Sequence, residues 1–324
     1  MPCGRTSGSG KSSLYLALPG GGTLFHRKMT PAPASRISRR FAQRGEAGEM
    51  GIVAYLTAGD PSLEATAKFV LALAEAGADV IELGVPFSDP LADGPTIQRA
   101  SERALKSGTT LSKVLDLVRQ IRRSNSAARE ISLVLFSYYN PVLQMGLEEF
   151  AGSAAGAGAD GVLITDLTAE ESEDYRRVLG ARHLDTIFLA APTSTDERLA
   201  RIAACSSGFL YLISRTGVTG AKDALPDDLP ALLRRARRVT QLPIAVGFGI
   251  SLPGHVSVLG GLADAAVVGS ALVSEIENAT GKDASPAAIE AAAAVLAARI
   301  RAFKQAARSG LSRRDPLPKH EVAP

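Results

Sequence analysis

Eight short apolar runs alternate with segments of helical periodicity over about 250 residues of this chain, and that alternation limits the folds open to it. Apolar runs separated by amphipathic stretches are typical of parallel strands joined by crossover helices. Eight such units predict an α/β fold, a closed (β/α)₈ TIM barrel, with an open doubly wound sheet as the structural alternative. The strands are expected at residues 52–58, 79–85, 131–137, 161–166, 186–191, 208–214, 243–249 and 265–269.

Helices are expected between these strands, and the barrel places its active site at the carboxyl ends of the strands. The clearest helical segments are residues 63–76, 111–123, 170–179, 196–205 and 229–240. Glycines at several strand ends favour the barrel over the open sheet, because they let the backbone of several loops approach one ligand closely.

The two ends of the chain differ in composition from the part between them. Residues 1–34 are rich in Gly, Ser and Pro and are expected to be disordered or a leader, either a transit peptide or residues ahead of a true start at Met29. Residues 35–304 are expected to form one catalytic barrel domain with an extra N-terminal helix, and residues 305–324 a flexible C-terminal tail. The stretch GRTSGSGKSS at 4–13 resembles a phosphate loop, but Arg5 replaces the required glycine and no strand precedes it.

Charge and cysteine content exclude several classes of protein. The net charge is +3, but residues 1–50 carry +6, so the remainder is mildly acidic and nucleic-acid binding is not expected. Cys3 and Cys205 offer neither a disulfide framework nor a metal-binding spacing. No run is long and apolar enough to span a membrane. A cytoplasmic location is expected, with organellar import if residues 1–34 are a transit peptide.

Glu82 lies in the second predicted strand, on a face where an apolar side chain is expected. Alternation places Val80, Glu82 and Gly84 on one face of that strand. Burial disfavours the charged form of a carboxyl and raises its pKa, which predicts a proton donor near neutral pH. Asp93 follows in a loop of Pro and Gly, where solvent is expected to keep it ionised. The two are a candidate acid–base pair, although a buried glutamate can also be the structural partner of an arginine.

Glycines cluster after the sixth, seventh and eighth predicted strands. The clusters are residues 217–220 (GVTG), residues 247–249 (GFG), and Gly269 with Ser270. These loops are neighbours in a barrel, and open backbone amides at a helix N-terminus bind phosphate without Lys or Arg. The expected ligand therefore carries a phosphate at one end, with both acids on the far side of the barrel mouth.

Aromatic side chains near strand ends indicate a flat apolar pocket, although such residues are as often ordinary core. They are Tyr55, Phe136, Tyr138, Tyr211 and Phe248. The four histidines fall in tails or connecting segments, so none is a convincing base or metal ligand, and serine-nucleophile hydrolysis is not expected.

Five ordered motifs give the chain a resemblance to a known family. They are AYLTAGDP at 54–61, ELGVPFSDPLADGP at 82–95, SYYNP at 137–141, SRTGVTGA at 214–221 and GFGIS at 247–251. Together they resemble the tryptophan synthase alpha subunit from about residue 35 to residue 279. The resemblance implies a lyase of tryptophan biosynthesis that cleaves indole-3-glycerol phosphate to indole and glyceraldehyde 3-phosphate by a retro-aldol reaction.

The resemblance also implies a role for individual residues. Glu82 matches the general acid/base, Asp93 the carboxylate at the indole nitrogen, and Tyr211 the active-site tyrosine. The other implied positions are Tyr55, Phe136, Leu163, Thr219 and Phe248 for the rest of the substrate, Gly220, Gly249, Gly269 and Ser270 for the phosphate, and Asp166 and Arg215 for closure of a mobile loop. No metal is implied. One departure is Thr168, where the family commonly has proline, and this is expected to loosen the turn after Asp166.

Family members pair with a beta subunit in an alpha2-beta2 heterotetramer, and the beta subunit receives indole through a tunnel. The resemblance implies that residues 86–93 and Asn140 face this partner. Because no pyridoxal-binding pattern occurs in this chain, pyridoxal phosphate is expected in the beta subunit. Two alternatives remain open from the sequence: a stand-alone lyase that releases free indole, and a non-catalytic binding subunit.

Overall fold

All strands of the computed structural model are parallel, and strands that follow one another in the chain lie side by side in one sheet. The structure describes residues 35–214, 225–247, 249–281 and 283–309. Over these residues the sheet has the order β5-β4-β3-β2-β1-β9-β8-β7-β6. The strands are β1 (Gly51–Thr57), β2 (Val80–Gly84), β3 (Ser132–Ser137), β4 (Gly161–Ile164), β5 (Asp185–Ile187), β6 (Leu189–Ala190), β7 (Leu210–Ile213), β8 (Ile244–Gly247) and β9 (Ala265–Val268).

The two strands at the edges of this order, β5 and β6, are consecutive parts of one run with Phe188 between them. β5 pairs with β4, whereas β6 pairs with β7. The backbone oxygen of Phe188 also accepts a hydrogen bond from the backbone nitrogen of Tyr211 at 3.3 Å. The fifth predicted strand therefore divides its pairing between two neighbours and closes the sheet. This confirms the (β/α)₈ barrel and rules out the open sheet.

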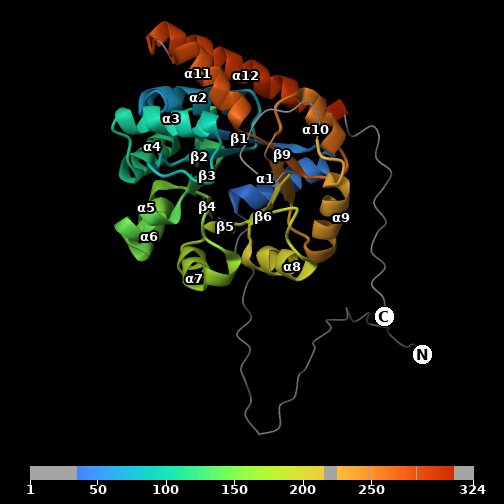
Figure 1. Cartoon of the computed structure of the whole chain (residues 1–324). Coiled ribbons are helices and arrows are strands. Elements are labelled where there is room, and N and C mark those ends of the chain that lie inside the picture. Colours follow the sequence, from blue (N-terminus) through green and yellow to red (C-terminus); the bar gives the residue numbers. More distant parts are fainter. Residues whose placement is uncertain (1–34, 215–224, 248, 282, 310–324) are drawn as a thin grey trace, which may run out of the picture. The chain divides into compact units, whose positions relative to one another are not determined.

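Helices surround the ring of strands (Figure 1). Several begin at a hydroxyl side chain that accepts a backbone N–H, for example Ser62, Thr110 and Thr195, which is a common N-cap arrangement. The helices are α1 (Arg36–Glu46), α2 (Leu63–Glu75), α3 (Pro95–Lys106), α4 (Leu111–Arg123), α5 (Tyr139–Met145), α6 (Leu147–Ala157), α7 (Glu173–Ala181), α8 (Asp196–Cys205), α9 (Leu229–Val239), α10 (Pro253–Leu259), α11 (Ser270–Thr280) and α12 (Pro286–Ser309), with short 3-10 helices at η1 (Ala127–Glu130) and η2 (Ala169–Glu171).

Strand alternation divides the apolar side chains between two clusters. One cluster lies between the strands and the helices and includes Ile81 and Leu83 of β2. The other fills the interior of the barrel and includes Val80 of the same strand, together with Tyr55 and Tyr211. Because side chains alternate along β2, Glu82 shares the interior face with Val80. The predicted face of Glu82 is therefore the face that the structure shows.

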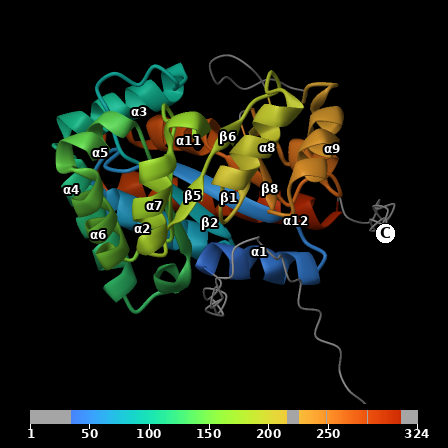
Figure 2. The same ribbon diagram turned by 90° about the horizontal axis from the view of Figure 1, so that it is seen from below.

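α1 closes the barrel at the amino-terminal ends of the strands (Figure 2). Its Phe41 belongs to the interior cluster and contacts Phe209 edge to face, with the ring centroids 5.6 Å apart. Arg36 pairs with Asp160, which lies just before β4, at 2.9 Å. With this end covered, a ligand reaches the interior from the carboxyl ends of the strands.

α12 extends further than the sequence suggests. The helix continues to Ser309, and Ala306 and Ala307 are buried, so residues 305–309 belong to the barrel rather than to a tail. The small apolar residues of this segment pack well in a helix, whereas the expectation of a tail follows from the polar residues beyond them. The expectations for residues 1–34 and 310–324 lie outside the described residues.

Candidate active site

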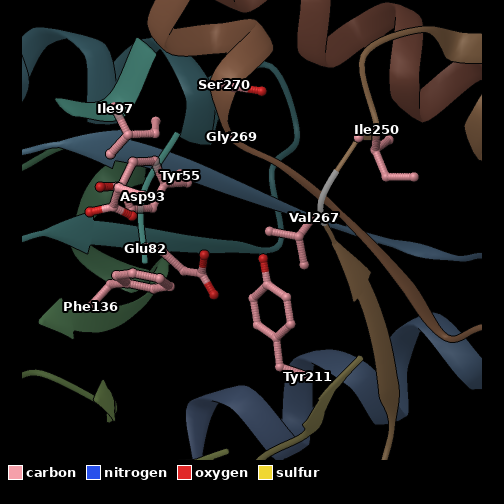
Figure 3. A pocket seen from close by; sticks show the side chains of 11 residues that line it. Tyr55, Glu82, Asp93, Ile97, Phe136, Tyr211, Ile250, Val267, Gly269 and Ser270 are labelled. Carbon is pink, nitrogen blue, oxygen red and sulfur yellow. The ribbon is translucent and has the colours of Figure 1, made fainter. Parts of the chain in front are cut away.

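Glu82 is completely buried at the middle of β2, and its side chain points into the barrel (Figure 3). Neither carboxyl oxygen has a hydrogen-bond partner among the described residues. Burial raises the pKa of Glu82 from 4.5 to about 8. A structural glutamate would pair with an arginine, and no arginine in the described part of the chain pairs with Glu82. Glu82 is therefore a neutral acid at pH 7 that has a proton to give.

Asp93 lies in the loop between β2 and α3, at the edge of the same pocket. Its Oδ2 accepts a hydrogen bond from the Tyr138 hydroxyl at 3.1 Å. Burial raises the pKa of Asp93 from 3.8 to about 6, although the bond from Tyr138 opposes the rise. Asp93 is half-buried, so it keeps more contact with solvent than the fully buried Glu82. The pKa of Asp93 is lower than that of Glu82, so Asp93 loses its proton at a lower pH.

Two tyrosines line the pocket, and a glycine on a neighbouring strand leaves room for the ring of each. Tyr55 lies beside Glu82 in the register of β1 and β2, and its ring packs edge to face on Phe136 with the centroids 5.2 Å apart. Tyr211 extends from β7 and its hydroxyl points into the same space as the Glu82 carboxyl (Figure 3). A Cβ built on Gly247 would lie 2.3 Å from the Tyr211 hydroxyl oxygen, so only glycine fits beside that ring.

Backbone from two further loops borders the pocket. Gly249 follows β8 with a φ of +96°, a conformation that side chains disfavour. Gly269 precedes α11, and Ser270 is the first residue of that helix. All three residues line the pocket that contains Glu82 and Asp93. A helix N-terminus with unpaired N–H groups at this position attracts an anion.

The pocket holds about 500 Å³ of empty space, including the part open to solvent. Three of the residues that line it, Ile97, Ile250 and Val267, were not expected from the sequence. Val267 follows from strand alternation in β9, but Ile97 in α3 and Ile250 after β8 have no signal that separates them from ordinary core residues. The described part of the lining contains no Lys, Arg or His.

Two of the expected site residues do not line the pocket. Leu163 is fully buried in the interior cluster but is not part of the pocket wall. Asp166 is exposed, and its Oδ1 accepts the backbone N–H of Tyr139 at 2.7 Å. The remaining expected residues lie outside the described residues: Arg215, Thr219, Gly220 and Phe248.

No group of three or more His, Cys, Asp or Glu in the part of the chain that the structure describes is arranged to hold a metal ion. No helix in the same residues has the length and apolar character needed to cross a bilayer.

A closed barrel with a protonated acid, a second carboxyl and backbone amides at one mouth defines the chain as a (β/α)₈-barrel enzyme with an acid–base site. Comparison with known proteins narrows this class. The sequence model of the family described as "Tryptophan synthase alpha chain" matches residues 41–307 of this chain. The tryptophan synthase alpha chain of Solibacter usitatus is 51% identical over 256 residues, which are 79% of this chain and 93% of the relative. That of Geotalea uraniireducens is 48% identical over 249 residues, 77% and 92% of the two chains.

Solved structures agree with the sequence relatives. A chain of Mycobacterium tuberculosis tryptophan synthase superimposes with a TM-score of 0.75 at 35% identity, covering 85% of this chain and 99% of that chain. The alpha subunit of tryptophan synthase from Legionella pneumophila gives a TM-score of 0.74 at 36% identity, with coverages of 85% and 99%. The chain belongs to the tryptophan synthase alpha chain family. This confirms the resemblance and the enzyme class that it implied, a lyase that cleaves indole-3-glycerol phosphate.

Proposed function

We propose that the pocket of Glu82 and Asp93 is where this chain cleaves indole-3-glycerol phosphate to indole and glyceraldehyde 3-phosphate. The observation that carries the proposal is Glu82, a fully buried carboxyl that has no hydrogen-bond partner among the residues the structure describes and that lines the same cavity as Gly269 and Ser270. A cavity with a proton donor and an anion-binding edge suits a substrate with an aromatic ring at one end and a phosphate at the other.

Glu82 acts twice in the proposed reaction. Its carboxylic acid donates a proton to the indole ring carbon that carries the glycerol chain, and the ring nitrogen becomes positively charged. The resulting Glu82 carboxylate takes the proton from the adjacent glycerol hydroxyl while the carbon–carbon bond breaks. The electron pair of that bond returns to the ring, which leaves neutral indole, and the hydroxyl carbon becomes the aldehyde. Glu82 ends protonated, as it began.

Asp93 stabilises the intermediate in which the ring is protonated. A carboxylate with a pKa of about 6 is mostly ionised at pH 7, so it can accept the ring N–H and balance its positive charge. Tyr55, Phe136 and Tyr211 supply the aromatic walls of the slot. We assign the phosphate to the backbone of Gly249, Gly269 and Ser270, and from the resemblance to Gly220. The resemblance likewise assigns Thr219 and Phe248 to the substrate and Arg215, with Asp166, to loop closure.

We further propose that the chain delivers indole to a pyridoxal-phosphate-dependent beta subunit in an alpha2-beta2 heterotetramer, in the cytoplasm. Two large apolar side chains support a partner at the barrel mouth. Leu91 is 90% exposed in the loop before Asp93, and Leu143 is 53% exposed on α5, the helix that contains Asn140. Exposed apolar residues on two neighbouring segments of one rim are typical of a protein interface.

An indole-release assay tests the proposal. The purified chain should form indole from indole-3-glycerol phosphate, and Glu82→Gln should reduce kcat by about 10²- to 10⁴-fold, the usual contribution of general acid–base catalysis. Glu75→Gln, an exposed glutamate on α2, is the matched control and should leave turnover unchanged. Near-normal turnover by Glu82→Gln would refute the role of Glu82, and no indole from the wild type with or without a beta subunit would refute the reaction.

The same assay separates the remaining alternatives. Strong activation by an added beta subunit supports the subunit function, whereas a rate indifferent to that subunit supports a stand-alone lyase. Any indole release excludes a non-catalytic binding subunit.

A further inference from the structure

Tyr138 sits at the point where the end of β3 meets the loop that carries Asp93. Its hydroxyl oxygen accepts the backbone N–H of Ala92 at 3.0 Å, and the same hydroxyl donates to Asp93 Oδ2 at 3.1 Å. An amide N–H can only donate, so the tyrosine hydroxyl is the acceptor in the first bond and its single proton is directed to the carboxyl. These two hydrogen bonds hold both the backbone at Ala92 and the carboxyl of Asp93 in place.

The ring of Tyr138 is held as firmly as its hydroxyl. Tyr138 is buried and lies against Phe87, from the start of the same loop, with the ring centroids 5.1 Å apart. Burial and the nearby Asp93 raise the pKa of Tyr138 well above 10, so the hydroxyl keeps its proton throughout the neutral range. The hydroxyl is therefore a permanent donor to Asp93.

We propose that Tyr138 is a positioning residue for the lyase reaction: it holds the Asp93 carboxylate toward the substrate ring nitrogen and stabilises its ionised form. The inference rests on the proposed role of Asp93 and adds a residue that lies outside the pocket lining. A hydrogen bond donated to a carboxylate favours the charged form and lowers its pKa. Without this bond, burial would leave more of Asp93 protonated at neutral pH, where a protonated Asp93 cannot balance the positive ring.

The other groups around Asp93 do not replace Tyr138. Tyr55 on β1 and Glu82 on β2 share the pocket, and burial raises the pKa of both, so both are neutral at pH 7. α3 faces the pocket with Ile97 and α11 with Ser270, neither of which titrates. The described lining has no cation that would hold Asp93 ionised.

Tyr138→Phe tests the proposal, because the change removes one oxygen and keeps the ring against Phe87. The acid limb of the pH profile of kcat for indole release should move up by about one pH unit, the effect of one charged hydrogen bond at a half-buried site. At pH 6 the variant should lose about fivefold relative to wild type, and near pH 7.5 most of that loss should disappear. A merely structural role would lower the rate equally at every pH.

Tyr139→Phe is the matched control, since it removes the same atom from the next residue and keeps the backbone N–H that Asp166 accepts. Its profile should superimpose on that of the wild type. The pKa of Asp93, measured by ¹³C NMR of its carboxyl carbon in both variants, gives a readout independent of turnover. An unchanged Asp93 pKa and an unmoved acid limb in Tyr138→Phe would overturn this proposal while leaving the lyase function intact. A wild type that releases no indole would instead overturn the function.

Discussion

Gly84 leaves the space that the side chain of Tyr55 occupies. A Cβ built on Gly84 would lie 2.1 Å from the Tyr55 hydroxyl oxygen and 2.6 Å from the ring carbon that carries it. Gly84 pairs with Thr57, two residues beyond Tyr55 on β1, and shares the interior face of β2 with Glu82. Because Gly84 has no side chain, the ring of Tyr55 can lie against the end of β2 and form one wall of the pocket.

Gly84→Ala is predicted to displace the Tyr55 ring and to narrow the pocket. Overpacking of a buried site costs about 1–3 kcal/mol of unfolding free energy, and KM for indole-3-glycerol phosphate should rise as the slot changes shape. Gly156→Ala on α6 is the control, because its Cβ would meet nothing within 4 Å. That variant should keep wild-type kinetics and gain up to about 1 kcal/mol, as alanine suits a helix better than glycine. Unchanged KM and stability in Gly84→Ala would contradict the packing argument.

Glu82 should make the stability of the fold depend on pH. The folded pKa of about 8 lies above the ordinary 4.5, so between these values the folded chain keeps a proton that the unfolded chain has released. The stabilisation is complete below pH 4.5 and is lost as the pH rises toward 8. Glu82→Gln lacks this titration, so its stability relative to wild type should increase by about 3 kcal/mol between pH 5.5 and 8.5.

Urea denaturation of both proteins across this range provides the measurement. Asp93 titrates in both, so its contribution cancels in the difference. Glu75→Gln on the exposed face of α2 should run parallel to wild type. A constant difference between Glu82→Gln and wild type would show that Glu82 does not titrate as a buried acid.

Arg103 is predicted to matter far more for stability than Arg99, although both pair with Glu277 on α11. Arg103 also makes two bonds of 2.8 Å to Asp60, which is 1% exposed. Arg103→Met should therefore cost about 3–5 kcal/mol, because it leaves a buried carboxylate unpaired. Arg99 is half-exposed, and Arg99→Met should cost less than about 1 kcal/mol. Equal losses in chemical denaturation would contradict this ranking.

Leu143→Asp should weaken association with the beta subunit. A charge placed on an apolar side chain of an interface must be desolvated, and we expect at least about a tenfold rise in Kd. Val258→Asp is the control, since Val258 is also exposed, at 62%, but lies on α10 rather than on the rim that contains α5 (Figure 1). Calorimetric titration with a beta subunit compares the two. If both variants bind equally well, α5 does not contact the partner.

Most of the fold could be predicted because alternation is a local property of the chain. The helices expected at 111–123 and 196–205 coincide with α4 and α8. The division of the fifth strand at Phe188 could not be predicted, because it depends on which neighbours β5 and β6 pair with. The end of α12 at Ser309 was missed for a similar reason: the helix is stabilised by packing against α2, α10 and α11, which the sequence does not display.

The residues of the candidate site were also predictable only where a local pattern in the sequence marked them. Glu82 was identifiable because a carboxyl on the interior face of a strand conflicts with the pattern around it. The burial of Asp93 was missed because loop residues carry no periodicity, and it depends on contacts across 45 positions of sequence with Tyr138. Tyr138 itself was expected only as one aromatic near a strand end, since nothing local distinguishes a ring in the pocket wall from one behind it.

The most direct test of the account is the pKa of Glu82, measured by ¹³C NMR titration of its carboxyl carbon and assigned by the signal that disappears in Glu82→Gln. A buried acid that donates its proton to the indole ring requires a midpoint near 8. A midpoint near 4.5, the ordinary value for a solvated glutamate, would mean that Glu82 is ionised at neutral pH and cannot begin the reaction as proposed.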